Sequence, residues 1–324
     1  FQRSLIREFT LFIDTHAHLN FAEYKGQVED VLKRSFDVGV KKVVNIGSNY
    51  ETSKEAIKIV KTLQHSAEYE RVYAVVGCHP IHLMSDITET AKFDGKEYRF
   101  TTKKEEFDSD KYQKLIDSSD KVVGIGETGL DYFRLNDKAQ ISNVKSSPNE
   151  KMSNKRSLDK LEMTKKIQKK VFIKHIQLAQ KNNLPLVLHC RGTKDDPYTA
   201  YNEMLRILKS EILNLKSEIS GVAHCFVGNL KQAQEFIKLG FYIGVNGIVT
   251  FKNASELQSI IKKIPLDKIL LETDCPFLAP DPYRGKRNEP MYIPIIAQKI
   301  AELKNIDLNE VEKQTTENAK KLFK

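Results

Sequence analysis

The chain of 324 residues lacks any long apolar stretch, and no run approaches the roughly 18 residues that suggest a membrane-spanning helix. Charged residues make up 29% of the sequence and the mean hydropathy is −0.45, values that fit a soluble protein. Hydrophobic residues still reach 40%, which is enough for a sizeable core. These proportions indicate a folded globular protein rather than an integral membrane protein.

Cysteine is sparse, with four residues that show neither a disulfide-rich pattern nor a Cys-x-x-Cys pair. Each cysteine stands beside a polar residue of a candidate site. Because neighbouring side chains of a strand point to opposite faces, we expect the thiols to face away from that site. We therefore interpret the four cysteines as small core residues: Cys78, Cys190, Cys225 and Cys275. A zinc–thiolate site is the weaker alternative.

A glycine-rich dinucleotide loop is also missing, which disfavours a doubly wound open sheet. Instead, eight short β-branched runs alternate with stretches of helical spacing such as residues 52–63. This alternation predicts an α/β fold, a (β/α)8 TIM barrel that forms a single domain over residues 1–324. The predicted strands are Leu11–Asp14, Lys42–Ile46, Val72–Gly77, Val122–Glu127, Pro185–His189, Gly221–His224, Phe241–Val245 and Ile269–Thr273.

Two polar insertions widen the gaps after the third and fourth strands. Asp86–Lys111 is strongly charged, and Arg134–Arg156 contains few apolar residues. We expect the second insertion to be a mobile loop, because it cannot bury enough apolar surface to order itself. Neither insertion is expected to form a separate domain. The segment Pro294–Phe323 has helical spacing and should close the barrel.

Basic residues exceed acidic ones, giving a net charge of +9 and an isoelectric point near 9.1. Such a balance favours polyanionic partners, although a lysine-rich composition is weak evidence by itself. The segment Lys151–Lys170 carries eight Lys or Arg residues against two acids. We expect it to form the solvated approach to a helix and to add non-specific attraction to nucleic acid.

Potential metal ligands recur where the predicted strands end, and in a TIM barrel those ends converge on one site. A single His-x-His or a single strand-end acid is usually incidental. Here, however, six candidate ligands fall on five different strands in barrel order, and this joint occurrence predicts a metal site: His16, His18, Glu127, His189, His224 and Asp274.

The residue types explain how such a site can work. His16 and His18 are two positions apart, so both rings point to the same side of an extended segment and suit one cation. Glu127 has two oxygens that can bridge two metals. Asp274 can hold the first ion and orient, or accept a proton from, the attacking water. The second ion can be completed by the histidines of the fifth and sixth strands, His189 and His224.

The chain resembles the TatD family of DNases in a set of segments that covers nearly its whole length: DTHAHLN, GCHP, GIGETGLDYF, LVLHCRG, AHCFVG, ETDCPFLAP and RGKRNEP. The resemblance implies an amidohydrolase-like barrel and a metal-dependent nuclease. It implies one metal on His16, His18, Glu127 and Asp274, and another on Glu127, His189 and His224. Many amidohydrolases bridge their metals with a carboxylated lysine on the fourth strand, so Glu127 at that place favours TatD. Two positions vary within the family without touching the ligand set, Ala17 and Cys190.

Three further residues suit a phosphate group. His79 follows the third strand and precedes a proline that fixes the turn. Arg191 follows His189 and can present a fork to a phosphate. Arg287 lies in a basic loop after the eighth strand, residues 284–288, for which a solvated turn is the alternative interpretation.

Together these features predict a deoxyribonuclease with exonuclease action that hydrolyses DNA phosphodiester bonds by a two-metal mechanism, with Glu127 and Asp274 as catalytic residues. The resemblance implies Mg or Mn for activity, while four imidazoles also allow Zn or cobalt. One alternative is deacylation of D-aminoacyl-tRNA on the same metal site, to which some TatD-like proteins are linked. Another is a catalytically silent nucleic-acid-binding protein.

The expected partner is DNA, with RNA or tRNA as alternatives, and we expect no membrane partner. We expect a monomer. A cytoplasmic location is the default expectation and a nuclear one is an alternative. Secretion stays open, because the sequence begins at Phe1 rather than at Met.

Overall fold

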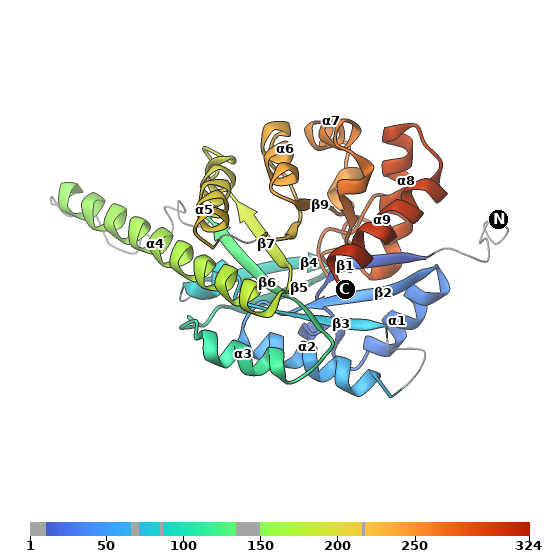
Figure 1. Cartoon of the computed structure of the whole chain (residues 1–324), viewed down its shortest axis with the longest axis horizontal. Coiled ribbons are helices and arrows are strands. Elements are labelled where there is room, and N and C mark those ends of the chain that lie inside the picture. Colours follow the sequence, from blue (N-terminus) through green and yellow to red (C-terminus); the bar gives the residue numbers. More distant parts are fainter. Residues whose placement is uncertain (1–10, 66–70, 85–86, 134–149, 216–217) are drawn as a thin grey trace.

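A ring of strands surrounded by helices makes up the chain, shown in Figure 1 as a computed structural model. The structure describes residues 11–65, 71–84, 87–133, 150–215 and 218–324. Eight parallel strands form one sheet in the order β1-β2-β3-β6-β7-β8-β9-β10, which confirms the predicted barrel. They are β1 (Phe12–Ala17), β2 (Val40–Ile46), β3 (Val72–Val76), β6 (Val122–Asp131), β7 (Leu186–Arg191), β8 (Gly221–Ala223), β9 (Phe241–Val245) and β10 (Ile269–Leu271).

The ring closes where β1 meets the segment after β10. Ala17 pairs with Cys275 in a parallel bridge, and the backbone N–H of His18 donates to the carbonyl of Cys275 at 2.9 Å. The carboxylate of Asp14 accepts from the backbone N–H of Thr273 at 3.0 Å and from its hydroxyl at 2.6 Å. These contacts hold the end of β1 beside the loop that follows β10.

Helices cover the outside of the barrel, and their buried faces follow the predicted spacing. On α2, for example, Ala56, Val60 and Leu63 are buried, and Asn49 caps the helix by accepting from the backbone N–H of Thr52. None of the helices in the described ranges is long and apolar enough to cross a membrane. The helices are α1 (Val28–Asp37), α2 (Tyr50–Leu63), α3 (Ser109–Asp117), α4 (Glu150–Asn182), α5 (Thr199–Leu215), α6 (Leu230–Lys238), α7 (Ser255–Lys263), α8 (Ile293–Lys304) and α9 (Leu308–Leu322).

An apolar layer fills the barrel below its C-terminal end. It draws buried residues from seven of the barrel strands, and Tyr242 of β9 packs against it partly buried. Ala319 and Leu322 of α9 belong to the same layer, so this helix seals the N-terminal end of the barrel. At the C-terminal end of the barrel, polar side chains take the place of this apolar layer. The predicted C-terminal helical segment is in fact two helices, because Asn305 adopts a left-handed conformation with φ +55° and ends α8.

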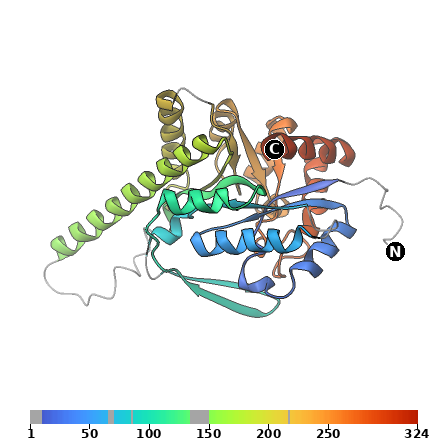
Figure 2. The same cartoon turned by 60° about the horizontal axis from the view of Figure 1, so that its bottom comes forward.

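The insertion after β3 contains structure that the sequence analysis missed. Strands β4 (Thr88–Phe93) and β5 (Lys96–Thr101) form an antiparallel hairpin outside the barrel, which Figure 2 shows below α2 and α3. Its turn is the pair Asp94–Gly95, both with positive φ, which is a common hairpin signal. The tip contacts the loop after β10, because Asp94 donates its backbone N–H to the carbonyl of Gly285 at 2.9 Å.

The predicted mobile insertion, residues 134–156, lies mostly outside the described residues. Its end does not fit the prediction, because residues 150–156 are the first two turns of α4. Helix α4 projects well beyond the barrel in Figure 1. The basic segment 151–170 is therefore part of one long helix rather than its approach.

Candidate metal centre

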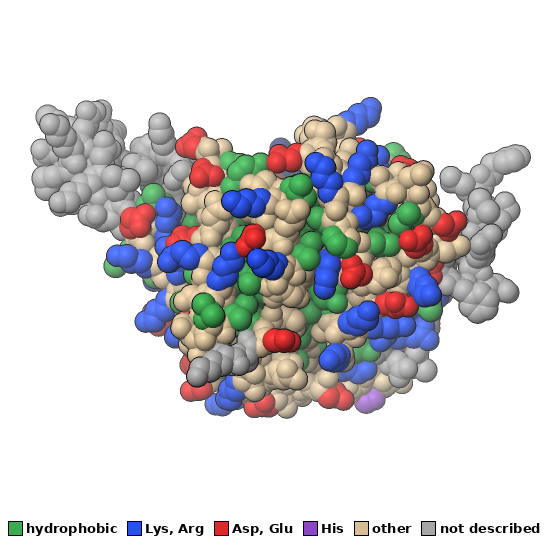
Figure 3. Space-filling view, turned by 45° about the horizontal axis from the view of Figure 1, so that its top comes forward, with side chains coloured by type: hydrophobic (Ala, Val, Ile, Leu, Met, Phe, Trp, Pro, Cys, Tyr) green, Lys and Arg blue, Asp and Glu red, His purple; other side chains and the backbone are tan. Residues whose placement is uncertain are grey.

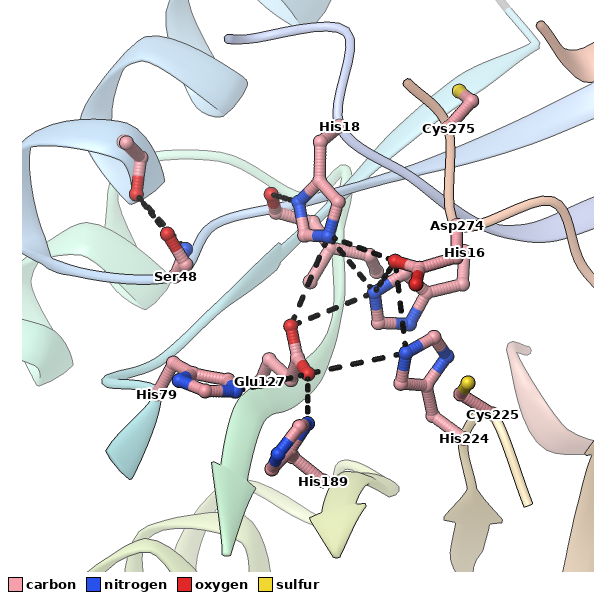
Figure 4. Close-up of polar contacts among 12 residues, drawn as sticks. His16, His18, Ser48, His79, Glu127, His189, His224, Cys225, Asp274 and Cys275 are labelled. Atoms are coloured by element: carbon pink, nitrogen blue, oxygen red, sulfur yellow. Dashed lines mark hydrogen bonds and ion pairs between the residues drawn. The ribbon is translucent and has the colours of Figure 1, made fainter. Parts of the chain in front are cut away.

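The predicted ligands meet at the C-terminal end of the barrel, as Figure 4 shows. Most are buried, and three are half-buried at the mouth of the barrel: His79, His189 and Asp274. The whole set comes from strands β1, β6 and β7 and from the loops after β1, β3, β8 and β10: His16, Glu127, His189, His18, His79, His224 and Asp274.

Glu127 reaches the centre from within β6, not from its end as the sequence suggested. Between β6 and β7, Gly126 pairs with Val187, and Thr128 pairs with the next residue, Leu188. Glu127 is therefore the extra residue of a β-bulge, a feature that turns a side chain out of the regular alternation. Gly126 permits the bulge, because its φ is +152° and a Cβ there would lie 2.5 Å from the carbonyl oxygen of Val187.

The two carboxylate oxygens of Glu127 face different imidazoles (Figure 4). Oε2 lies 3.6 Å from Nε2 of His16 and 3.8 Å from Nε2 of His18. Oε1 lies 2.9 Å, 3.6 Å and 3.9 Å from three other rings, at Nδ1 of His189, Nε2 of His79 and Nε2 of His224. A carboxylate in this position can share one cation with each group.

Asp274 lies beside the two rings that face Oε2 of Glu127, those of His16 and His18. Its Oδ1 lies 3.5 Å from Nε2 of His18 and 3.8 Å from Nε2 of His16, and these two nitrogens are 3.1 Å apart. The same oxygen is 3.7 Å from Nε2 of His224. The side chain of Asp274 is 15% exposed, against 5% for Glu127, so Asp274 is the carboxylate nearer to the mouth of the barrel.

The outer ring nitrogens of His18, His189 and His224 lie beside acceptors, whereas Nδ1 of His16 is buried without a hydrogen-bond partner among the described residues. Nδ1 of His18 lies 3.0 Å from the carbonyl oxygen of Ile46, and Nε2 of His189 lies 3.2 Å from Oδ2 of Asp131. A similar contact of 3.0 Å, an ion pair rather than a well-directed hydrogen bond, joins Nδ1 of His224 to Oε1 of Glu272. Such acceptors keep the ring proton on the outer nitrogen and leave the inner lone pair free. Lone pairs and carboxylates that converge in this way suit divalent metal ions.

His79 has the opposite arrangement. Its Nδ1 accepts the backbone N–H of Ile81 at 3.0 Å, so in the neutral ring Nε2 carries the proton. Burial, followed by the neighbouring His189, lowers the pKa of His79 to about 3, which keeps the ring neutral. His79 therefore presents an N–H donor to the centre. A donor suits an anionic oxygen and does not suit a metal ion.

Burial and the neighbouring carboxylates act on the other rings in opposite directions. Burial alone would lower the pKa of His189, but Asp131 and Glu127 raise it to about 9. Burial likewise opposes the charged form of His224, but Glu272 and Asp274 raise its pKa to about 10. Without a metal, these carboxylates favour the protonated form of both rings. These protons partly neutralise carboxylates that a bound cation would otherwise balance.

Metal binding should therefore release protons at pH 7. If His189 and His224 bind metal through their inner nitrogens, binding would displace about two protons per molecule. Affinity should rise as the pH increases from 7 towards the raised pKa values of about 9 and about 10. Titration calorimetry in two buffers with different ionisation enthalpies measures this release. Identical heats in the two buffers at pH 7 would contradict it.

Two orienting carboxylates were missed by the sequence analysis. Asp131 is 2% exposed and Glu272 is fully buried. Glu272 also accepts the backbone N–H of Cys225 at 2.6 Å, and it sits against Gly244, where a Cβ would lie 2.3 Å from Oε2. A signal was available in both cases. Asp131 stands four residues after Glu127 on one strand, and Glu272 directly follows the apolar strand β10, where acids are rare unless they are paired.

The two predicted phosphate-binding arginines differ in their surroundings. Arg191 is exposed at the end of β7, with its guanidinium carbon 3.7 Å from the ring centre of Phe133. Arg287 instead donates to the carbonyl of Glu23 at 2.7 Å and to Oε1 of Glu289 at 2.9 Å. Because the guanidinium of Arg287 already donates to these two protein groups, its surroundings favour a structural role over the predicted phosphate contact.

The rest of the basic loop is also held by protein groups. Arg284 stacks on Phe251 at 4.3 Å, and Lys286 lies 3.8 Å from Asp94. Asn288 donates to the carbonyls of Thr273 and Phe277 at 2.9 Å and 2.6 Å. The loop therefore supports the backbone on both sides of Asp274.

Three of the four thiols fit the prediction and one does not. Cys78, Cys190 and Cys275 belong to the buried apolar core. Cys225 is half-buried, and its sulfur lies within 4.8 Å of ligand atoms of His224 and Asp274. The alternation argument fails for Cys225 because β8 ends at Ala223 and Cys225 has a left-handed φ of +46°.

Comparison with known proteins identifies the family. A family model described as TatD related DNase matches residues 13–324. The chain belongs to the TatD family. YabD of Bacillus subtilis, an uncharacterized metal-dependent hydrolase, is 36% identical over 314 residues, which cover 97% of this chain and 99% of that protein. YcfH of Escherichia coli, also an uncharacterized metal-dependent hydrolase, is 29% identical and covers 96% and 95% of the two chains.

Solved TatD structures share the fold. The crystal structure of YjjV, a TatD homologue from Escherichia coli, has a TM-score of 0.73 at 26% identity and covers 96% of this chain and 97% of its own. A TatD family hydrolase from Entamoeba histolytica gives a TM-score of 0.71 at 23% identity, with 97% and 98% covered. This TatD chain is therefore a metal-dependent hydrolase on a TIM barrel, and its clustered histidines and carboxylates are the candidate metal centre.

Proposed function

We propose that the protein is a deoxyribonuclease that hydrolyses phosphodiester bonds with two divalent metal ions. The observation that carries the proposal is Glu127, whose two oxygens face two separate groups of imidazoles. One ion would be held by His16, His18, Glu127 and Asp274, and the other by Glu127, His189 and His224. When bound, such ions supply the positive charge that activates water and stabilises the phosphoryl oxygens.

The protein's own side chains then have distinct tasks. Asp274, at the mouth of the barrel, accepts a proton from the attacking water. His79 donates its Nε2–H to an oxygen of the phosphate. Asp131 and Glu272 keep the rings of His189 and His224 in the required orientation. A hydrogen-bond donor pointing into the site suits the anionic oxygen of a phosphate.

On the face shown in Figure 3, Lys and Arg side chains are spread among Asp and Glu side chains and form no single stripe. We therefore assign phosphate binding to Arg191 and His79 rather than to a broad basic surface. The proposal includes exonuclease action and the use of Mg or Mn.

A digest of labelled single- and double-stranded DNA with Mg, Mn, Co and Zn tests the proposal. The expected products are nucleotides released from a strand end. An aminoacyl-tRNA assay should run beside it. Intact tRNA freed of its amino acid, together with uncut DNA, would favour a deacylase. DNA binding that is equal with and without metal, and no turnover, would favour a silent binding protein.

Arg191→Ala should weaken the binding free energy for DNA by about 1–3 kcal/mol, because it removes a charge-assisted contact to phosphate. DNA cleavage should also fall with added salt, since phosphate contacts release counterions. Metal content should not change. The measurement is kcat and KM on DNA and on a small uncharged ester, across salt concentrations. Equal losses on both substrates would contradict phosphate binding by Arg191.

Two arginine variants serve as controls. Arg206→Ala removes the same charge from α5, where the side chain is 74% exposed, and should leave KM unchanged. Arg287→Ala should lower the thermal transition more than it changes KM, because its contacts to Glu23 and Glu289 hold the loop. A rise in KM for DNA without loss of stability in Arg287→Ala would restore its predicted phosphate role.

A further inference from the structure

Aromatic side chains flank the metal centre on two sides, and neither group has a role in the two-metal reaction. The first is Phe133, two residues after Asp131 at the end of β6. Its ring is half-buried, and the guanidinium of Arg191 stacks on it at 3.7 Å. The ammonium group of Lys194 lies 5.3 Å from the same ring centre. Phe133 also donates its backbone N–H to Oδ1 of Asp131 at 3.0 Å, which ties it to the carboxylate that orients His189.

The second aromatic group lies beside the first candidate metal position. The ring of Phe21 stacks on His18 with ring centres 4.4 Å apart and an angle of 14° between the planes. Phe277 meets Phe21 edge-on, at 6.3 Å and 68°. Both rings are half-buried. Two hydrogen bonds hold Phe277 in place. Its backbone N–H donates to the carbonyl of Asp274 at 3.0 Å, and the side chain of Asn288 donates to the carbonyl of Phe277 at 2.6 Å.

The order of the strands places these two groups opposite each other. Phe21 and Phe277 follow β1 and β10, which are joined where the ring closes. Phe133 and Arg191 lie at the ends of β6 and β7, the fourth and fifth strands of the ring of eight. In a closed ring of eight strands, the fourth and fifth lie half a turn from the eighth and first. The candidate metal centre therefore lies between the two aromatic groups.

Partly exposed rings beside cations are the groups that bind unpaired nucleic-acid bases. A base stacks on an aromatic or guanidinium plane, and a neighbouring Arg or Lys holds the phosphate next to it. A polypeptide or a lipid ligand would not need the guanidinium of Arg191 stacked on the ring of Phe133. In a paired duplex both faces of each base are already covered, so only unpaired bases can use such planes.

We propose that Phe133 with Arg191 forms one base-stacking subsite and Phe277 with Phe21 forms another, on opposite sides of the scissile phosphate. This inference rests on the proposed nuclease function and makes it more specific. In this arrangement one unpaired base is held on each side of the cleaved bond. The two rings set the position of the strand, and the metal centre acts on the phosphate between them.

Single-stranded oligonucleotides with one abasic residue next to the cleaved bond test the proposal. Phe133→Leu keeps an apolar side chain but removes the ring plane, and it should raise KM on the intact strand about tenfold. On a strand whose abasic residue occupies that subsite, Phe133→Leu and wild type should have the same KM. Phe277→Leu should behave in the same way with the abasic residue on the other side of the bond. Phe100→Leu, a matched change at a ring that is 43% exposed on β5, should alter neither value.

Several results would overturn the proposal. A variant that loses the same factor on intact and abasic strands has lost structure and not a stacking contact. Two variants that respond to the same side of the bond exclude flanking subsites. A wild-type protein that cleaves no DNA with any metal refutes the proposed function instead. In that case, fluorescence anisotropy of intact and abasic strands still measures stacking, and equal affinities of the wild type for both strands would refute the subsites themselves.

Discussion

Glu127→Gln should lose about three orders of magnitude in the rate of DNA cleavage, because it removes the one charge shared by both groups of imidazoles and with it several kcal/mol of transition-state stabilisation. The substitution keeps the volume of the side chain, so the bulge in β6 and the fold should persist. Bound metal should fall in parallel, since an amide oxygen is a poorer bridge than a carboxylate. Single-turnover cleavage and elemental analysis of the same preparation measure both effects.

Glu312→Gln is the matched control. Glu312 is a carboxylate with 9% exposure, but it lies on α9 at the closed end of the barrel, where it accepts the backbone N–H of Leu11 at 2.7 Å. This variant should retain metal and nearly full cleavage. Near-normal turnover of a folded, metal-replete Glu127→Gln protein would refute the two-metal proposal.

Asp274→Asn should lower kcat by about 10²–10⁴-fold, the usual contribution of a positioned general base. The carboxylate is the one nearer the mouth of the barrel, within 3.8 Å of ring nitrogens of His16 and His18, so it can both hold an ion and take a proton from water. The change should also flatten the acidic side of the pH–rate profile. Stopped-flow cleavage at saturating DNA across pH measures both effects.

Asp281→Asn gives the comparison within the same loop, seven residues further along the chain. It removes the same charge without touching the imidazoles and should leave the pH–rate profile unchanged. If Asp274→Asn changed only KM and left kcat intact, Asp274 would bind substrate or metal without acting as a base.

The candidate centre was largely predictable because a parallel barrel brings all strand ends to one side. His16 and His18 are two residues apart at the end of β1, and the bridge between Ala17 and Cys275 places Asp274 beside them. The positions of the eight strands followed from β-branched runs and helical spacing. Such signals are local, so a linear sequence carries them completely.

Other features depend on the partner that each polar atom finds in the folded chain. Whether His79 offers a proton or a lone pair depends on the backbone N–H of Ile81. The orientation of His224 depends on Glu272, and the guanidinium of Arg287 donates to Glu23 and Glu289. A strand-end pattern gives the residue type and its approximate place, and says nothing about the second partner of each polar atom.

The sequence by itself determined the barrel, the set of candidate ligand residues and their order around the mouth. Only the tertiary structure decided that Glu127 sits on a bulge, that Cys225 faces the centre, and that aromatic rings flank it on opposite sides. The physical reason is that strand and helix periodicities arise from neighbouring residues. Hydrogen-bond partners, ring stacking and burial arise from residues that meet only after the barrel has closed.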